Sequence, residues 1–507
     1  MRSHTSTRRG LRLILTLGAG GLIELLSTHG SVNRHVLLAA ITLLLLSYLV
    51  SEVLSVRREQ PQTWLLNPAV MTSAVTFAIS FGVTNVLFFL PADMLEPVDL
   101  TPYVSHSMIK LMWLVLLAAI AMWVGYRSPI GKNIGRRLSQ GTHHRWIRSA
   151  PKPHAFAIPC LAAVALMARL LQLHFGIFGY ASNYANLIEM GRFTQYLSMA
   201  ASLGPLSLLL AALTHYWHPK SRYCSILLVV ILVIEIGFGI LSGFKSQVAM
   251  PFVIVGVCYY LTHGRIPIVW IGGFVLAIFL AYAVIQPYRN VRNSQYAGSG
   301  DSVSAVASSI VSAQDEPVAG SYTKGPTWLN FLARSSLLSV GSLGIAYQDA
   351  GKGLPAGSPA FLKNLIMAPV YAVVPRFLAP GKPVGNMGLW YTRVVLGKDI
   401  MSATAPSPFT YLYFAGGTLA IVAFFWLLGT GLKLMTLLLR PSDSIAASLV
   451  YLVLLGTVAT VPSAVDGMAV NIIRTVPLIL LVQLLLFPKR ASRRPHMIVA
   501  QHPQKAG

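Results

Sequence analysis

The chain has 507 residues, of which 55% are hydrophobic and only 11% charged, and its mean hydropathy is +0.64. This composition excludes an ordinary soluble globular protein and indicates a polytopic membrane protein. The formal net charge of +24 does not indicate nucleic-acid binding, because much of it flanks hydrophobic stretches, where Lys and Arg attract anionic lipid. We therefore expect membrane lipid, and no nucleic acid, as a partner.

Hydrophobic stretches of spanning length, about 18 residues or more, recur along most of the chain. They lie at 11–27, 36–56, 69–90, 107–126, 155–175, 197–216, 225–242, 247–263, 268–286, 409–437, 445–462 and 469–487. We therefore predict an all-α, polytopic integral membrane protein of about 12 transmembrane helices. Basic residues precede the first stretch, but no small-residue cleavage site follows it, so we predict a retained helix and not a signal peptide.

The Lys and Arg residues of the short loops predict the orientation of the helices. Residues 127–154 and the tail 488–507 are basic, whereas 91–106 carries acids alone. Both termini are therefore predicted to face the cytoplasm, and the long segment 287–408 faces outward. The predicted regions are helices 1–9 within 1–286, the large outer loop at 287–408, helices 10–12 within 409–487 and a cytoplasmic tail at 488–507.

The outer segment 287–408 interrupts the hydrophobic series and is the predicted location of the chemistry. Its basic residues outnumber its acidic ones, which favours an anionic ligand such as a phosphate or an acidic sugar. The stretches 328–347 and 361–379 carry enough apolar surface to form short amphipathic helices that lie on the membrane or pack against the bundle. Pro369 and Pro375 exclude a straight spanning helix in the second of them.

Several charges lie where a membrane makes them costly. Arg169 and Arg474 fall inside predicted helices, at a cost of about 2.5–3.5 kcal/mol each if central, and Lys245 lies in a tight turn between two helices. Glu24 and Glu235 are the acids within the predicted spans. Substrate binding is one interpretation of the cations. The other is structural: an ion pair or snorkelling for the arginines, and a solvated turn for the lysine.

Motifs of several common enzyme classes are absent from the sequence. It contains no Walker loop, no C-x-x-C, no H-E-x-x-H and no G-x-S-x-G, so nucleotide hydrolysis, zinc chemistry and a serine-hydrolase elbow lack support. The three cysteines, Cys160, Cys224 and Cys258, lie in or beside hydrophobic stretches and are expected to stay reduced.

Four short segments on the predicted outer side carry a resemblance to a known family. They are SGFKS at 242–246, QPYR at 286–289, VPRFLAPGKP at 374–383 and PSPFTYLYFAGG at 406–417. In these segments the chain resembles the O-antigen polymerase (Wzy-type) family of bacterial oligosaccharide repeat-unit polymerases. The resemblance spans roughly 240–430, and the first half of the chain is similar only in hydropathy.

The resemblance implies a metal-independent glycosyltransferase that needs no cofactor. Such an enzyme lies in the bacterial inner membrane and moves a growing glycan from undecaprenyl pyrophosphate onto the next lipid-linked repeat unit at the periplasmic face. The substrate would be an undecaprenyl-pyrophosphate-linked oligosaccharide, and a chain-length-determining co-polymerase is the implied protein partner.

That reaction builds negative charge on the leaving pyrophosphate, so it needs fixed cations near the lipid interface. Arginine suits this role because its planar guanidinium binds phosphate oxygens bidentately. Arg289 and Arg376 are therefore the first catalytic candidates. The substrate-binding candidates are Arg292, Lys245, Lys382, Tyr288, Arg169 and Arg474.

The acceptor hydroxyl needs a general base, ideally a carboxylate close to the reacting oxygen. Asp349, in Tyr347-Gln348-Asp349, and Asp466, in the last outer turn opposite Arg474, are the best-placed catalytic candidates, and a solvated surface acid is the alternative for both. Trp390 is a candidate to stack on a sugar face, which an interfacial aromatic belt explains equally well.

Three other classes remain open. O-antigen ligases are expected to use a histidine in the long outer loop, and residues 287–408 contain no histidine. A lipid-linked oligosaccharide flippase or other transporter would show discontinuous helices in matched positions of both halves. A structural subunit of an export complex would tolerate neutralisation of Arg289 and Arg376. The sequence favours a repeat-unit polymerase for O-antigen, exopolysaccharide or capsule.

Overall fold

The computed structural model describes most of the chain. The described residues are 2–30, 32–96, 103–142, 153–154, 156–179, 191–295, 327–351, 354–355, 358–374, 387–398, 404, 406–439, 441, 444–458 and 465–487. Every regular element among them is a helix. The all-α prediction is therefore confirmed over this part of the chain.

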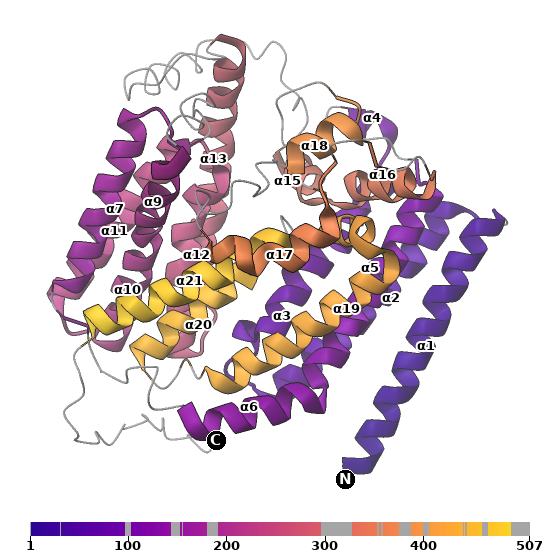
Figure 1. The fold of residues 1–507 in the computed structure, drawn as a ribbon, viewed down its shortest axis with the longest axis horizontal. Coiled ribbons are helices and arrows are strands. Elements are labelled where there is room, and N and C mark those ends of the chain that lie inside the picture. The colour runs from indigo at the N-terminus through magenta and orange to yellow at the C-terminus, as the bar shows by residue number, and fades with distance from the viewer. Residues whose placement is uncertain are drawn as a thin grey trace.

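The N-terminal helices and the long helix α19 build one bundle around a shared apolar core. Its elements are α1 (Arg2–His29), α2 (Arg34–Glu59), η1 (Trp64–Leu66), α3 (Pro68–Thr72), η2 (Ser73–Ile79), η3 (Val83–Phe89), α4 (Ala92–Leu95), α5 (His106–Arg127), α6 (Pro129–Thr142), α16 (Leu338–Asp349) and α19 (Pro408–Leu438). Figure 1 shows this bundle on the right, with α19 crossing in front of α5.

The middle of the chain builds a second bundle, which Figure 1 shows on the left. Its elements are α7 (Ala157–His174), α9 (Gly191–Ala201), α10 (Leu203–Trp217), α11 (Arg222–Leu241), α12 (Lys245–His263), α13 (Ile268–Gln295), α20 (Ile445–Val458) and α21 (Val465–Leu486). The bundles meet where α20 packs beside α3 and α10. There the Tyr451 hydroxyl donates a buried hydrogen bond of 2.6 Å to the Leu66 carbonyl.

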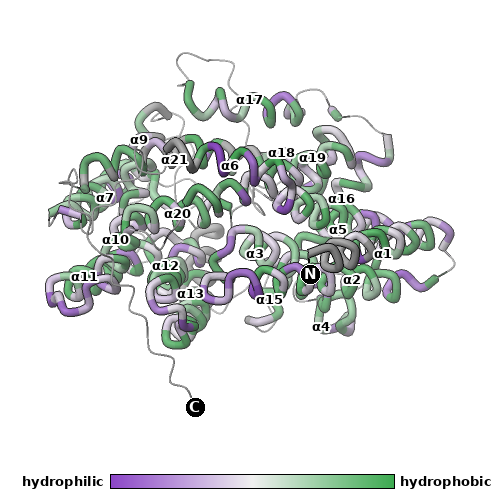
Figure 2. The backbone as a smooth tube through the Cα atoms, turned by 90° about the horizontal axis from the view of Figure 1, so that it is seen from below, coloured by the Kyte–Doolittle hydropathy of each residue, from purple (hydrophilic) through white to green (hydrophobic). Residues whose placement is uncertain are grey.

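Seven helices among the described residues are long and apolar enough to cross a membrane. They are Arg34–Glu59, Pro68–Phe89, His106–Arg127, Ala157–His174, Tyr196–Trp217, Arg222–Leu241 and Pro408–Leu438. All twelve hydrophobic stretches of the sequence overlap helices, and Figure 2 shows hydrophobic residues along most of the tube in both bundles. The number of twelve crossings stays a prediction.

The stretch 69–90 forms three successive helical segments and not one continuous α-helix. A π-helical segment (η2) and a 3-10 segment (η3) follow α3, and Gly82 lies between them. Buried polar side chains there bond backbone carbonyls: Thr84 donates to Ser80 at 3.0 Å and Asn85 to Phe81 at 2.7 Å. Such side chains compete with the regular helical pattern, which accounts for the break.

Helices α5 and α19 form the most extensive helix pair of the fold. Glycines on both helices allow their backbones to touch: a methyl group at Gly125 would overlap the Trp426 carbonyl, and one at Gly429 would overlap the Met122 carbonyl. The backbone of α19 leaves the helical conformation at Gly416 and Gly417. This kink lets Phe409 and Phe425, on either side of it, stack with ring centroids 5.1 Å apart. The pair therefore packs as one unit.

The two ends of the molecule differ. The start of α1 and the basic helix α6 lie at one end, and α16 lies at the other with α15 (Thr327–Ser335) and α18 (Met387–Val394) (Figure 1). We call these the α6 end and the α16 end. The predicted basic loop 127–154 thus begins as helix α6, which packs on α19 through Gly131 and Gly135.

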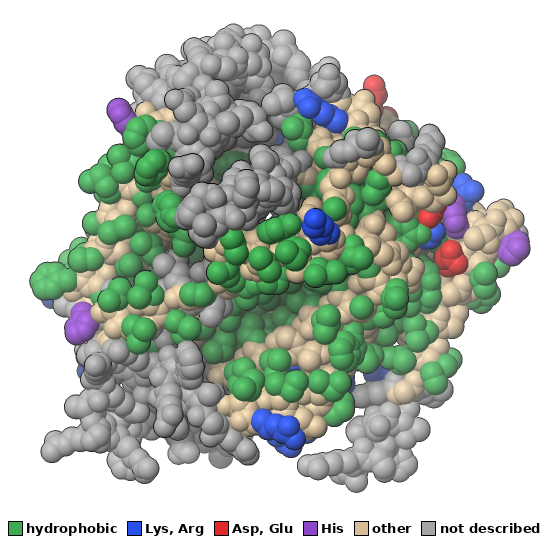
Figure 3. Space-filling view, in the orientation of Figure 1, with side chains coloured by type: hydrophobic (Ala, Val, Ile, Leu, Met, Phe, Trp, Pro, Cys, Tyr) green, Lys and Arg blue, Asp and Glu red, His purple; other side chains and the backbone are tan. Residues whose placement is uncertain are grey.

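The segment 287–408 contains short helices that its sequence predicts. The stretch 328–347 forms α15 and α16, and 361–379 forms α17 (Phe361–Val373). Helix α17 contains Pro369 and packs against α21 and α19, so it joins the two bundles. Figure 3 shows hydrophobic side chains around a hollow between α17 and α19. Of the two arrangements predicted for this stretch, its described helix adopts the second, packed against the bundle.

Candidate functional site

The predicted catalytic residue Asp349 lies in a polar cluster with Lys110 and Tyr413. The Lys110 ammonium donates to Oδ2 of Asp349 at 2.7 Å, and the Tyr413 hydroxyl donates to Oδ1 at 2.7 Å. The Lys110 nitrogen also lies 5.3 Å from the centre of the Tyr413 ring. The side chain of Lys110 is 25% exposed to solvent and that of Asp349 is 36% exposed. The carboxylate is thus held by both oxygens and stays accessible.

Close packing of α16 places Asp349 at this position. Asp349 is the last residue of α16, and the glycines at 341 and 344 let that helix approach its neighbours. A methyl group at Gly341 would come within 2.8 Å of Leu111 on α5. The Thr410 hydroxyl of α19 donates to the Gly341 carbonyl at 3.0 Å. Helix α16 is therefore wedged between the helices that supply Lys110 and Tyr413.

Aromatic side chains fasten α17 and α18 onto α19 beside this cluster. Phe361 of α17 lies 5.3 Å from Trp390 and 5.0 Å from Phe414, centroid to centroid. The fully buried Tyr391 donates to the Val340 carbonyl of α16 at 2.5 Å, and burial raises the pKa of its phenol. Trp390 is thus half-buried against other aromatic rings, and its predicted sugar stacking and the alternative of an interfacial belt both stay untested.

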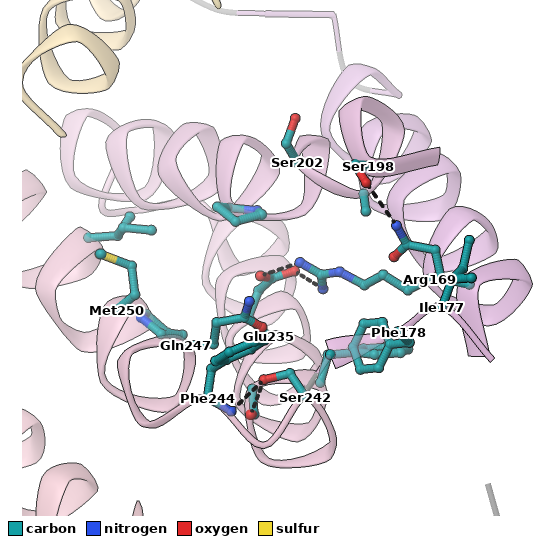
Figure 4. Close-up of a pocket in the computed structure, with 18 residues that line it drawn as sticks. Arg169, Ile177, Phe178, Ser198, Ser202, Glu235, Ser242, Phe244, Gln247 and Met250 are labelled. Atoms are coloured by element: carbon teal, nitrogen blue, oxygen red, sulfur yellow. Dashed lines mark hydrogen bonds and ion pairs between the residues drawn. The ribbon is translucent and has the colours of Figure 1, made fainter. Parts of the chain in front are cut away.

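A second polar region is a cavity of about 410 Å³ between α7, α9, α10, α11 and α12. Arg169 and Glu235 point toward each other in it (Figure 4). Arg169 donates to the two carboxylate oxygens at 2.6 and 2.9 Å. Their side chains are 11% and 7% exposed, so the ion pair predicted as the structural role of Arg169 is present, and it also lines a cavity.

The pair is packed closely on the sides that face Gly204 and Phe238, and it borders the cavity elsewhere. Gly204 of α10 lies directly beside it, and a methyl group there would come within 2.6 Å of an Arg169 nitrogen. On another side the guanidinium carbon lies 5.1 Å from the centre of the Phe238 ring, a cation–π contact. Both contacts fix the guanidinium in one orientation.

The turn 242–246, one of the segments that resemble the polymerase family, forms part of the cavity wall. Gly243 has φ +68°, which favours glycine, and the Ser242 hydroxyl accepts a 3.1 Å hydrogen bond from the Phe244 backbone. Ser242 and Phe244 both line the cavity. Lys245 is the first residue of α12 and is partly buried.

The side chains of most remaining predicted residues are outside what the structure describes. Tyr288, Arg289 and Arg292 belong to the last turns of α13, and Asp466 and Arg474 belong to α21, but their side chains are outside what the structure describes. Arg376 and Lys382 lie outside the described residues altogether. In the described part of the chain, no three His, Cys, Asp or Glu side chains gather closely enough to hold a metal ion.

The sequence analysis did not predict two members of the Asp349 cluster, Lys110 and Tyr413. It also did not predict that Glu235 forms an ion pair with Arg169. Lys110 lies one turn into an apolar stretch, directly after a loop without basic residues, which is a position where a cation needs a partner. Arg169 and Glu235 are opposite charges within two predicted spans, and pairing such charges would have found the second site.

The fold and these two polar regions define a class: an all-helical protein with helices apolar enough to cross a membrane and polar side chains gathered between them. The chain belongs to the family described as Domain of unknown function (DUF8712), which residues 159–439 match. No curated protein and no solved structure matches the chain. The matched region includes the whole cavity, Asp349 and Tyr413, but not Lys110.

Proposed function

We propose that the protein is a polysaccharide repeat-unit polymerase of the bacterial inner membrane. It transfers a growing glycan from undecaprenyl pyrophosphate onto the next lipid-linked repeat unit, without a metal, at the periplasmic face. In this proposal about twelve helices cross the membrane, both termini are cytoplasmic, 287–408 is periplasmic, and a co-polymerase sets the chain length. The product is O-antigen, exopolysaccharide or capsule.

The observation that carries the proposal is the Asp349 carboxylate held between Lys110 and Tyr413. Glycosyl transfer needs a carboxylate that accepts the proton of the acceptor hydroxyl while that oxygen bonds to C1 of the donor sugar. A carboxylate has about four lone-pair sites, and two hydrogen bonds orient Asp349 while leaving others accessible. Orientation of this kind is what a general base requires.

The leaving group of the same reaction needs cations other than Lys110, which is paired with Asp349. As the C1–O bond breaks, the electron pair goes to the pyrophosphate oxygen, and a fixed cation stabilises the growing charge. Lys110 is paired with Asp349 at 2.7 Å, so in this proposal it orients the base, and Arg289 and Arg376 stabilise the charge of the pyrophosphate. The hydrophobic side chains around the hollow between α17 and α19 (Figure 3) offer an apolar surface to a lipid tail.

Deletion of the gene tests the proposal. We expect single repeat units on the cell surface or on the outer-leaflet carrier, with no longer chains, when glycans are separated on gels and lipid-linked intermediates are weighed by mass spectrometry. Long chains stranded on the carrier would instead identify a ligase, and single units held on the cytoplasmic leaflet would identify a flippase. Normal chain lengths would refute all three.

Two arginines of the outer segment supply a sharper prediction within that strain. Arg289→Ala and Arg376→Ala are each expected to abolish chain elongation while the protein still folds and inserts, because each removes a cation that stabilises the leaving pyrophosphate. Chain length in the complemented deletion strain is the readout, and membrane abundance of each variant is the control. Wild-type chains from both variants would remove these residues from the site.

A further inference from the structure

The cavity between α7, α9, α10, α11 and α12 is separate from the Asp349 cluster, and the proposed function does not use it. Its volume of about 410 Å³ lies in the range of small-molecule sites, roughly 300–1,000 Å³. Buried charges between helices of this kind are costly, so an ion pair that lines an open space, instead of being packed over, points to a ligand. The question is which chemistry the space accepts.

The charge balance argues against an anion. Arg169 and Glu235 are the charged side chains among the described residues that line the cavity, so those residues carry no net charge. Both terminal nitrogens of the guanidinium already donate to the carboxylate, at 2.6 and 2.9 Å. A phosphate entering here would meet the negative charge of Glu235, and it would have to displace that carboxylate to bind Arg169 bidentately.

The unused hydrogen-bonding capacity of the pair suits hydroxyl groups. A guanidinium has five N–H donors and a carboxylate about four lone-pair sites, so after their two mutual bonds both still have capacity. The wall adds the amides of Gln172 and Gln247 and the hydroxyls of Ser198 and Ser202. Gln172 donates to Ser198 at 3.4 Å and Ser202 donates to the Met199 carbonyl at 2.6 Å, so both hydroxyls can still accept. A sugar hydroxyl donates and accepts at once, and this wall offers both kinds of partner side by side.

The remaining wall suits the apolar face of a sugar ring. Phe178, Phe238 and Phe244 line the cavity, and the rings of Phe178 and Phe238 meet edge to face with centroids 5.9 Å apart. Specific small-molecule sites combine mostly apolar walls with a few placed polar groups, and this wall does the same. A polyol with C–H faces matches it better than a compact, charged pyrophosphate does.

We infer that this cavity is a binding site for an uncharged sugar residue, in which the neutral Arg169–Glu235 pair bonds the hydroxyls and the phenylalanines cover the ring. Its place in the reaction rests on the proposed function: it would hold a sugar of a repeat unit, and the pyrophosphate would lie elsewhere. The binding site itself stands on the cavity alone.

Ligand binding to the purified full chain tests the inference without any turnover. The protein is held in a detergent that contains no sugar, and glucose, galactose, rhamnose and N-acetylglucosamine are tested by saturation-transfer NMR, with inorganic pyrophosphate as competitor. We expect at least one sugar to bind and pyrophosphate not to displace it. Failure of all four sugars to bind, or displacement by pyrophosphate, would overturn the inference.

Two variants tie the binding to this cavity. Ser202→Trp is expected to weaken sugar binding at least tenfold because the side chain fills the cavity. Ser47→Trp is the matched control, since both serines are exposed and donate to the carbonyl three residues earlier. Glu235→Gln leaves Arg169 without its counter-charge, so it should lose sugar affinity and gain pyrophosphate binding. Unchanged sugar binding in Ser202→Trp would contradict the assignment.

The two proposals fail separately. If the deletion strain makes normal glycan chains while the purified protein still binds sugar in this cavity, the polymerase proposal is wrong and the sugar site stands. If elongation is lost in the deletion strain but no tested sugar binds, the polymerase proposal stands and the sugar site is wrong.

Discussion

Replacing Glu235 with alanine is expected to destabilise the protein by about 3–5 kcal/mol, the usual cost of removing one partner of a buried ion pair. Only 7% of the Glu235 side chain and 11% of the Arg169 side chain are exposed, so the guanidinium that remains would be charged, buried and without its carboxylate. Thermal unfolding of the purified variant, followed by circular dichroism, measures the loss.

A double variant separates the contribution of the two charges to stability from the contribution of side-chain packing. Arg169→Met with Glu235→Met removes both charges and keeps apolar volume, and replacement of a buried pair in this way is often neutral or stabilising. We expect the double variant to unfold at a higher temperature than Glu235→Ala. If the two unfold alike, the side-chain volumes and not the bidentate bonds of 2.6 and 2.9 Å stabilise this region.

Replacing Asp349 with asparagine is expected to slow chain elongation by about 10²–10⁴-fold, the usual contribution of a general base. The fold should tolerate the change, because the amide oxygen can still accept one of the two hydrogen bonds that Lys110 and Tyr413 donate. The readout is the glycan length distribution in the complemented deletion strain, together with the amount of protein in the membrane.

Two further variants make that result specific to Asp349. Asp93→Asn alters an exposed acid on α4, which lies at the α16 end of the molecule, as Asp349 does (Figure 1). This substitution should leave the glycan chain length unchanged. Tyr413→Phe removes one of the two donors and keeps Lys110, so a smaller loss is expected than with Asp349→Asn. Wild-type chains from Asp349→Asn would exclude the carboxylate as the base.

Hydropathy was enough to place the long apolar helices, because a spanning helix needs a long apolar stretch whatever it packs against. It did not find α6, in the predicted loop 127–154, or α18. The short helices α15, α16 and α17 were likewise predicted from apolar stretches within 287–408. The broken stretch 69–90 was not, since its geometry depends on side-chain bonds such as that of Asn85 to Phe81, and hydropathy does not register them. How the helices pair, as with α5 and α19, also had to come from the structure.

The candidate site was predicted only in part. Asp349 was a candidate because the expected reaction needs a general base, and Arg169 because a cation inside a predicted span is costly. Their partners were missed because Lys110 is 239 residues from Asp349 along the chain and Glu235 is 66 from Arg169. The catalytic candidates Arg289, Arg376 and Asp466, and the binding candidates Arg292 and Lys382, remain predictions.

The contact between α5 and α19 sets a limit on how this protein can be divided. The family match begins at residue 159, beyond the end of α5, yet α5 supplies the backbone against which Gly429 is seated and the ammonium that holds Asp349. A fragment trimmed to residues 159–439 would therefore expose one side of α19 and deprive Asp349 of Lys110, leaving Tyr413 as its hydrogen-bond donor. The smallest autonomous unit that retains the Asp349 cluster has to start before His106.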